Sequence, residues 1–112
     1  MLCLSIRQPY VELILRGEKR IEYRSRPTRR IGERFCIYAS LQPGPAEVWE
    51  QIGCRPGDLP TGYVVGSAVI RACVTNGEPG MYEWHLVDVK RYRRMRRVAP
   101  GRHPQPVWFR PW

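Results

Sequence analysis

The chain has 112 residues, enough for one hydrophobic core and too few for two, so we expect a single domain over residues 1–112. Nineteen basic residues against ten acidic ones give a net charge of +9, and the basic excess lies in residues 1–34 and 82–112. This charge favours a nucleic-acid partner over an anionic membrane, because no basic amphipathic helix is evident. A solvated surface that only keeps the protein soluble is the alternative.

Several classes of protein are disfavoured by what the sequence lacks. No apolar stretch approaches the ~18 residues of a membrane span, and no signal peptide is recognised, so we expect a cytosolic protein without a membrane partner. The four cysteines form no C-x-x-C pair and are predicted to be buried, reduced thiols: Cys3, Cys36, Cys54 and Cys73. A zinc site needs closely spaced ligands, so we expect no metal, no cofactor and a monomer.

The first third of the chain predicts a strand, a helix and two further strands. Leu2–Ile6 is a short apolar run typical of a buried strand. A helix is expected to begin at Gln8 with Pro9 in its first turn, and to end at Gly17, which supplies a left-handed stop. The alternating segment Lys19–Ser25 predicts a second strand and Arg34–Ser40 a third, with a basic loop between them.

The remainder predicts one helix and three strands. Gly66 lies within a valine-rich segment and indicates a bend or bulge there. The expected elements are a helix over Pro43–Gly53, strands over Gly62–Val74, Tyr82–Tyr92 and Pro106–Arg110, and a basic loop over Arg93–Arg102. About six short strands without βαβ alternation predict a mixed α+β, mainly β fold. We expect a small closed or nearly closed barrel with one or two short helices at its side.

Lys19, Glu22 and Arg24 are the candidate chemical groups of the second strand. Alternation places Glu22 and Arg24 on one face, where they can pair, and Lys19 on the other face. A paired Glu22 is structural, whereas a free one could accept a hydrogen bond from a base edge or act as a general base. Lys19 is either a solvated charge or, if buried, a base or nucleophile with a lowered pKa. Lys19 joins Glu22 only if the strand begins at or just after Lys19.

Cations and aromatic residues interleave at both ends of the chain, a pattern typical of phosphate binding and base stacking. Trp49, Trp84 and Trp108 are expected more often as core anchors than as stacking platforms. The candidate phosphate ligands in the second group are Lys90, Arg91, Arg93 and Arg94, whose alternative is a solvated hairpin rim.

Two segments near the N-terminus, Leu4–Tyr10 and Leu13–Ser25, resemble the ASCH domain, the activating-signal-cointegrator homology family. Three later groups of segments resemble the next strand, the central strand and the closing strands of that family: Gly32–Ser40, Gly62–Val69, and Trp84–Val89 with Gln105–Trp108. The resemblance implies a PUA-like barrel with a cleft beside the first helix. Members are associated with RNA or DNA binding and with transcription coactivation or RNA metabolism.

By motif position, the resemblance implies a cleft that holds single-stranded RNA or DNA, or an unpaired or modified base. The residues expected to line it are Arg7, Tyr10, Lys19, Glu22 and Arg24, with Ser5 and Tyr38 nearby.

One branch of the family hydrolyses acetylated cytidine, and it resembles Gly17–Ile21, with Lys19 at the position of its catalytic lysine. That branch carries threonine at the position of Glu22, and its catalytic glutamate has no counterpart here. We therefore favour a binding module over an enzyme. A small hydrolase, either an amidohydrolase or a ribonuclease, using Lys19 and Glu22 is the alternative. A protein-interaction adaptor is a third, weaker possibility.

Overall fold

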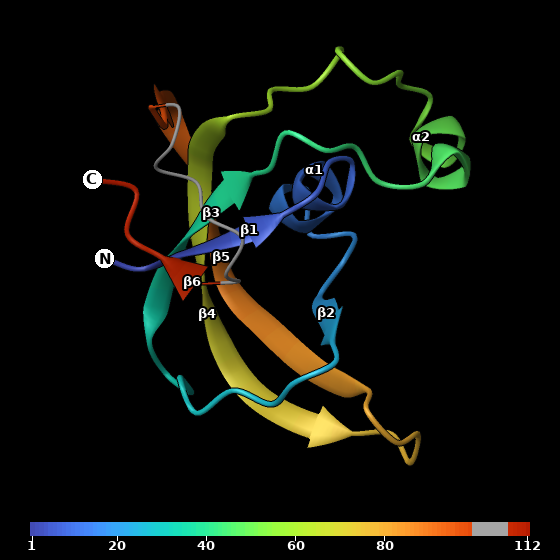
Figure 1. Ribbon diagram of the computed structural model, residues 1–112, viewed down its shortest axis with the longest axis vertical. Helices are drawn as coiled ribbons and strands as arrows, with labels where there is room; N and C mark the ends of the chain where they lie inside the picture. Colours follow the sequence, from blue (N-terminus) through green and yellow to red (C-terminus); the bar gives the residue numbers. More distant parts are fainter. Residues whose placement is uncertain (100–107) are drawn as a thin grey trace.

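The structure is a computed structural model that describes residues 1–99 and 108–112. In this part of the chain, six strands form one sheet in the order β2-β5-β4-β3-β1-β6 (Figure 1). The elements are β1 (Cys3–Ile6), α1 (Tyr10–Leu15), β2 (Ile21–Arg24), β3 (Arg34–Ala39), α2 (Ala46–Ile52), β4 (Tyr63–Thr75), β5 (Tyr82–Arg97) and β6 (Trp108–Phe109). The mixed, mainly β fold class predicted from the sequence is confirmed.

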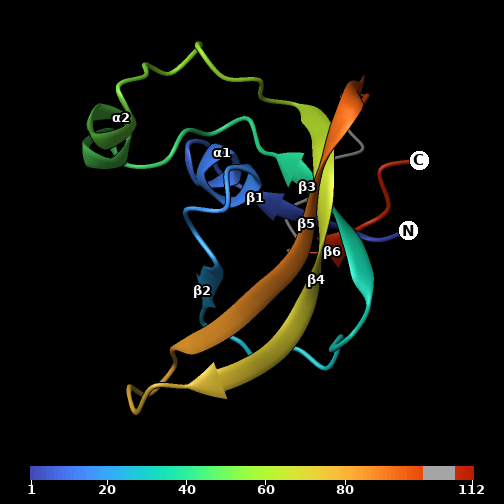
Figure 2. The ribbon, with the colours of Figure 1, turned by 180° about the vertical axis from the view of Figure 1, so that it is seen from behind.

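The sheet is built around the long antiparallel pair β4–β5. β1 and β3 are parallel, and the chain between them crosses over through α1 and β2. The other pairs, β1–β6, β2–β5 and β3–β4, are antiparallel. This crossover places α1 and β2 on one side of β5, and β2 pairs with the start of that strand, Tyr82–His85 (Figure 2).

The sheet is strongly curved but is not closed into a barrel, because β2 and β6 are its two unjoined edges. Side chains bridge these edges instead. Trp84 of β5 stacks on Trp108 of β6 with ring centroids 5.8 Å apart, and Arg24 Nη2 of β2 donates to the Ser5 carbonyl of β1 at 2.9 Å. The closed form of the predicted barrel is therefore wrong. Both edge strands are short, and side chains rather than a hydrogen-bond ladder link β5 to β6 and β2 to β1 across the opening.

The main hydrophobic core lies between α1 and the sheet. Val11 and Ile14 of α1 are fully buried against apolar residues of β1, β3, β4 and β5. Pro9 is the N-cap residue of the helix, and Gly17 follows it with φ of 80°, a left-handed conformation that favours glycine. Residues 1–99 and 108–112 form two helices, α1 and α2, and neither is long and apolar enough to span a membrane.

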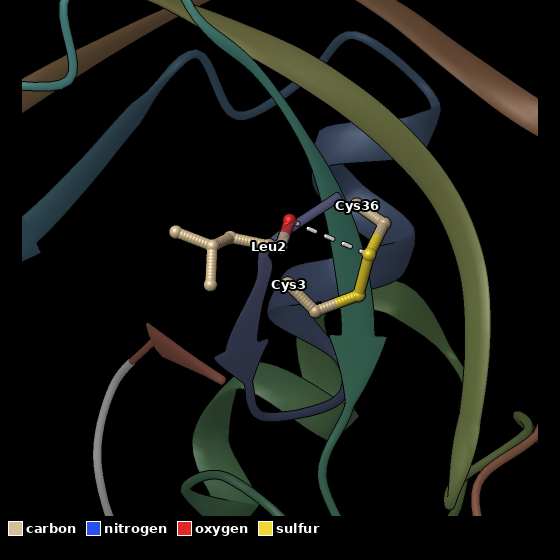
Figure 3. The surroundings of a disulfide bond; sticks show 3 residues. All are labelled: Leu2, Cys3 and Cys36. Atoms are coloured by element: carbon tan, nitrogen blue, oxygen red, sulfur yellow. Dashed lines mark hydrogen bonds between the residues drawn. A yellow bond between two sulfur atoms is a disulfide. The ribbon is translucent and has the colours of Figure 1, made fainter. Parts of the chain in front are cut away.

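A second core lies on the opposite face of the sheet. Its members are Cys3, Cys36, Tyr38, Val64, Val98 and Phe109. Cys3 and Cys36 are aligned partners of the parallel β1–β3 pair and form a disulfide, with Cα atoms 4.4 Å apart (Figure 3). The prediction that both are reduced thiols is wrong. These cysteines are 33 residues apart in sequence, and only the strand pairing brings them together. Cys54 and Cys73 are free and half-buried.

β5 is longer than the sequence predicts. The expected basic loop over Arg93–Arg102 is wrong up to Arg97, because β5 continues to pair with the start of β4 through Val64–Arg96 and Tyr63–Arg97. The register shifts around Gly66, as predicted for that glycine. A Cβ at Gly66 would meet Leu15 Cδ2 at 2.8 Å, so the glycine lets α1 pack closely on β4. Of the strand predicted over 106–110, residues 106–107 lie outside the described part.

Candidate nucleic-acid interface

Lys19 lies between α1 and β2, and its side chain turns toward the aromatic residues of both. Because β2 begins at Ile21, Lys19 escapes the alternation of that strand. Its Nζ lies 5.2 Å from the ring centroid of Tyr10 and 5.1 Å from that of Tyr23. Both distances suit cation–π contacts, so the two rings hold the ammonium from α1 and from β2.

Glu22 is buried and is shared by the two cations. Arg24 Nε donates to Glu22 Oε2 at 2.9 Å, and Arg24 Nη2 forms an ion pair with the same oxygen at 2.7 Å. Lys19 Nζ lies 3.9 Å from Oε1. Lys19 and Glu22 therefore lie together, as expected if the strand begins just after Lys19. The Arg24 pair corresponds to the structural alternative for Glu22, since the carboxylate is already held by a neighbouring guanidinium.

Partial burial lowers the pKa of Lys19 below its ordinary value of 10.5. Removal from water disfavours the charged ammonium, and this is the largest effect. Glu22 opposes it by attracting the positive charge, and Arg24 adds to it by repulsion. Lys19 therefore releases its proton at a lower pH than a solvated lysine does.

Arg24 connects this site to the edge of β1 and to the core. Besides holding Glu22, its guanidinium donates to the Ser5 carbonyl and lies 5.8 Å from the ring of Trp84. Ser5 thus contributes a backbone oxygen. Its side chain alternates with those of Leu4 and Ile6 in the main core, which places it on the face of the second core.

Two of the residues predicted to lie in the cleft, Tyr38 and Arg7, lie elsewhere. Tyr38 is 2% exposed in the second core, and burial raises the pKa of its hydroxyl. Arg7 is exposed and donates to Gln42 Oε1 at 3.3 Å. Tyr10 is half-buried, and a Cβ at Gly44 would lie 3.3 Å from its Cε2, so the loop before α2 packs against this ring.

A second set of predicted residues lies on the basic segment of β5, which we define as Lys90–Arg97. All of its residues except Tyr92 are exposed. Between the pairs Gly66–Arg91 and Val64–Arg96 the register shifts, so that Arg93 and Arg94 lie in an irregular stretch of the strand. Such bulges re-aim side chains away from the regular pleat. Within residues 1–99 and 108–112, no carboxylate pairs with Lys90, Arg93, Arg94 or Arg97.

Arg91 differs from its neighbours because it is bound to a buried carboxylate. Its Nη1 and Nη2 donate to the two oxygens of Glu12 at 3.0 and 2.9 Å, and Arg16 Nε donates to Oε2 at 2.8 Å. These hydrogen bonds, with that from Arg91 the largest, lower the pKa of Glu12 although its burial opposes them. Glu12 was missed by the sequence analysis, because an acidic residue on a helix gives no sign of a partner 79 residues away.

A stacked column of side chains was also missed by the sequence analysis. Arg24 lies over Trp84, Trp84 stacks on Trp108 with an interplanar angle of 10°, and Arg30 lies 5.5 Å from the ring of Trp108. Trp84 and Trp49 are buried, as predicted for core anchors, and Trp108 is half-buried. In the part of the chain that the structure describes, no group of three or more histidine, cysteine or acidic residues could hold a metal ion.

Comparison with known proteins gives two concordant matches. The sequence model of the ASCH domain family matches residues 4–97. Human and mouse proteins named activating signal cointegrator 1 are each 34% identical to this chain over 83 residues. That alignment covers 65% of this chain and only 14% of each relative.

Proposed function

The chain belongs to the ASCH domain family, and from this membership and the geometry above we propose that it is a nucleic-acid-binding module. It holds single-stranded RNA or DNA, with an unpaired or modified base at Lys19, Tyr10 and Tyr23. The observation that carries the proposal is the exposed basic segment of β5, whose Lys90, Arg93, Arg94 and Arg97 lack carboxylate partners in the described residues. The similarity to activating signal cointegrator 1 supports a role in transcription-linked regulation or RNA metabolism.

The two parts of the proposed interface have different tasks. The basic segment contacts phosphates, which gives affinity without sequence preference. Tyr10 and Tyr23 offer ring faces for a base, and Tyr23 is 50% exposed. Glu22 has a structural task, because its ion pairs with Arg24 and Lys19 keep the Lys19 ammonium beside the two rings.

Titration of labelled single-stranded RNA and DNA at several salt concentrations tests the phosphate contacts. We expect log K to fall linearly with log salt concentration. Replacing both Arg93 and Arg94 by Ala removes two phosphate contacts and lowers the steepness of this dependence by about 1 for each contact. The matched control is Arg55→Ala with Arg71→Ala, two exposed arginines whose guanidinium groups have no partner among the described residues. This control leaves the salt dependence nearly unchanged. Affinity that is absent at low salt, or insensitive to salt, overturns the proposal.

The alternative function is a small hydrolase acting on acetylated cytidine or on RNA. It is favoured by one observation, the lowered pKa of a half-buried Lys19 3.9 Å from Glu22. Against it stands the Arg24–Glu22 pair, because the Glu22 carboxylate is already bound by a neighbouring guanidinium. Incubation of N4-acetylcytidine and RNA with the wild type and with Lys19→Ala separates the two functions. No turnover, or turnover that the substitution leaves unchanged, excludes the enzyme.

A further inference from the structure

A cavity of about 220 Å³ lies apart from Lys19, where the N-terminal residues meet β3 and β6. It is smaller than the roughly 300–1,000 Å³ of pockets for drug-sized ligands, so it can hold only part of such a ligand, with the rest left outside. Its lining residues are Met1, Leu2, Arg30, Glu33, Arg34, Phe35, Trp108 and Arg110. Three arginines against one glutamate make this cavity positively charged.

The three arginines are not equally occupied. Arg30 donates to Glu33 at 3.2 Å, and Arg34 is bound to Asp88 and to the Ser67 hydroxyl. Arg110 is exposed and has no side-chain partner in residues 1–99 and 108–112. Its guanidinium is therefore available for an anion, and its planar fork suits the oxygens of a phosphate.

The apolar part of the cavity is aromatic. Phe35 and Trp108 meet edge to face with ring centroids 5.4 Å apart, and Arg30 lies over the Trp108 ring. The stack on Trp84 also holds Trp108 in place. A planar ring entering here would meet aromatic edges and a flat guanidinium, both of which favour contact with another π system.

We propose that this cavity binds a nucleoside monophosphate, with the phosphate on Arg110 and the base against Arg30, Phe35 and Trp108. The ligand is either a free nucleotide or the 5′-phosphorylated end of a strand, because both present the same chemistry. The site does not rest on the nucleic-acid function proposed for Lys19 and β5.

Adenosine 5′-monophosphate is a suitable probe, and the indole N–H signal of Trp108 in NMR spectra, assigned with Trp108→Phe, is a local readout. We expect a saturable shift of this signal, with adenosine and inorganic phosphate each binding at least about tenfold more weakly. Arg110→Ala weakens binding of the nucleotide about tenfold, and Arg55→Ala, in the exposed loop between α2 and β4, leaves it unchanged.

Three results overturn the proposal: no saturable shift, equal weakening by Arg110→Ala and Arg55→Ala, or inorganic phosphate binding as well as the nucleotide. A comparison of oligonucleotides with 5′-phosphate and 5′-hydroxyl ends separates the two sources. Tighter, Arg110-dependent binding of the phosphorylated strand assigns the site to strand ends, and binding of the mononucleotide without this preference assigns it to free nucleotides. Both support the site. The Arg93 and Arg94 variants leave mononucleotide binding intact, so failure of the β5 interface is distinguishable.

Discussion

At the scale of single residues, the pKa of Lys19 is set by two influences that lower it and one that raises it. Burial and Arg24 favour the neutral amine, whereas Glu22 favours the ammonium. Since the pKa in the folded protein is below that of the unfolded chain, folding is penalised while Lys19 is protonated. This penalty is relieved as the pH rises through the folded pKa, so this group makes stability increase with pH in that window.

Replacing Glu22 by Gln removes the influence that favours the ammonium, and we expect the pKa of Lys19 to fall further. The measurement is an NMR titration of the Lys19 side chain in the wild type and in Glu22→Gln. Glu18→Gln is the matched control, because Glu18 is an exposed carboxylate that does not contribute to the pKa shift of Lys19. A pKa that stays the same or rises in Glu22→Gln contradicts this account of the site.

The sequence predicted these residues but not all of their contacts. Period-2 alternation correctly indicated the Glu22–Arg24 pair, because both residues lie within the regular strand β2. Lys19 lies two residues before that strand, where alternation does not apply. Tyr38 followed from family position alone, and the structure places it in the second core.

At the scale of elements, one buried carboxylate joins α1 to β5. Glu12 is 8% exposed and accepts hydrogen bonds from Arg91 and Arg16. Because the pKa of Glu12 is lowered in the folded protein, its contribution to stability is fully present above its ordinary pKa of 4.5. The contribution is lost as the pH falls through the folded pKa.

We expect Glu12→Gln to reduce the free energy of unfolding by about 1–3 kcal/mol at neutral pH, since charge-assisted hydrogen bonds are lost. The difference from the wild type should shrink as the solution becomes more acidic than the ordinary pKa of 4.5. Urea denaturation over a pH series measures it. Glu50→Gln, on the exposed face of α2, should change stability by less than about 0.5 kcal/mol. A pH-independent loss in Glu12→Gln would mean that packing, not charge, is responsible.

Element types were more predictable than element lengths. Apolar runs, alternation and Gly or Pro positions indicated the elements found in residues 1–99 and 108–112, but charge density suggested a loop where β5 continues to Arg97. The strand persists because β4 offers a partner for its backbone, and its cationic residues remain exposed. Such pairing between distant segments is absent from any local pattern.

At the scale of the whole molecule, the disulfide ties β1 to β3 across the crossover that contains α1 and β2. Disulfides are typical of oxidising compartments, whereas the cytosol was expected from the sequence, so the compartment stays a prediction. The monomeric state also stays a prediction. The parallel pairing that aligns Cys3 with Cys36 depends on the topology, and no sequence spacing reveals it.

Reduction of the Cys3–Cys36 bond should lower the free energy of unfolding by about 3–4 kcal/mol, the range for loops of this length. Thiol labelling of the denatured protein should find two reactive cysteines without reductant and four with it. The double variant Cys3→Ala, Cys36→Ala is the control. Because it lacks the bond, its free energy of unfolding should be the same with and without reductant. Four reactive thiols before reduction would contradict the bond.

The curved sheet joins its two ends through the Trp84–Trp108 stack and through Arg24, not through a ladder of amides. Separating these ends therefore breaks a ring contact and one bond from a side chain to a carbonyl, while every strand keeps its partner. Bending of the sheet is consequently a softer motion than unpairing of any strand. We expect the distance between Arg24 and Ser5 to vary most readily, and with it the relative position of the Lys19 site and the arginine-lined cavity, which lie at opposite ends of the same stacked column.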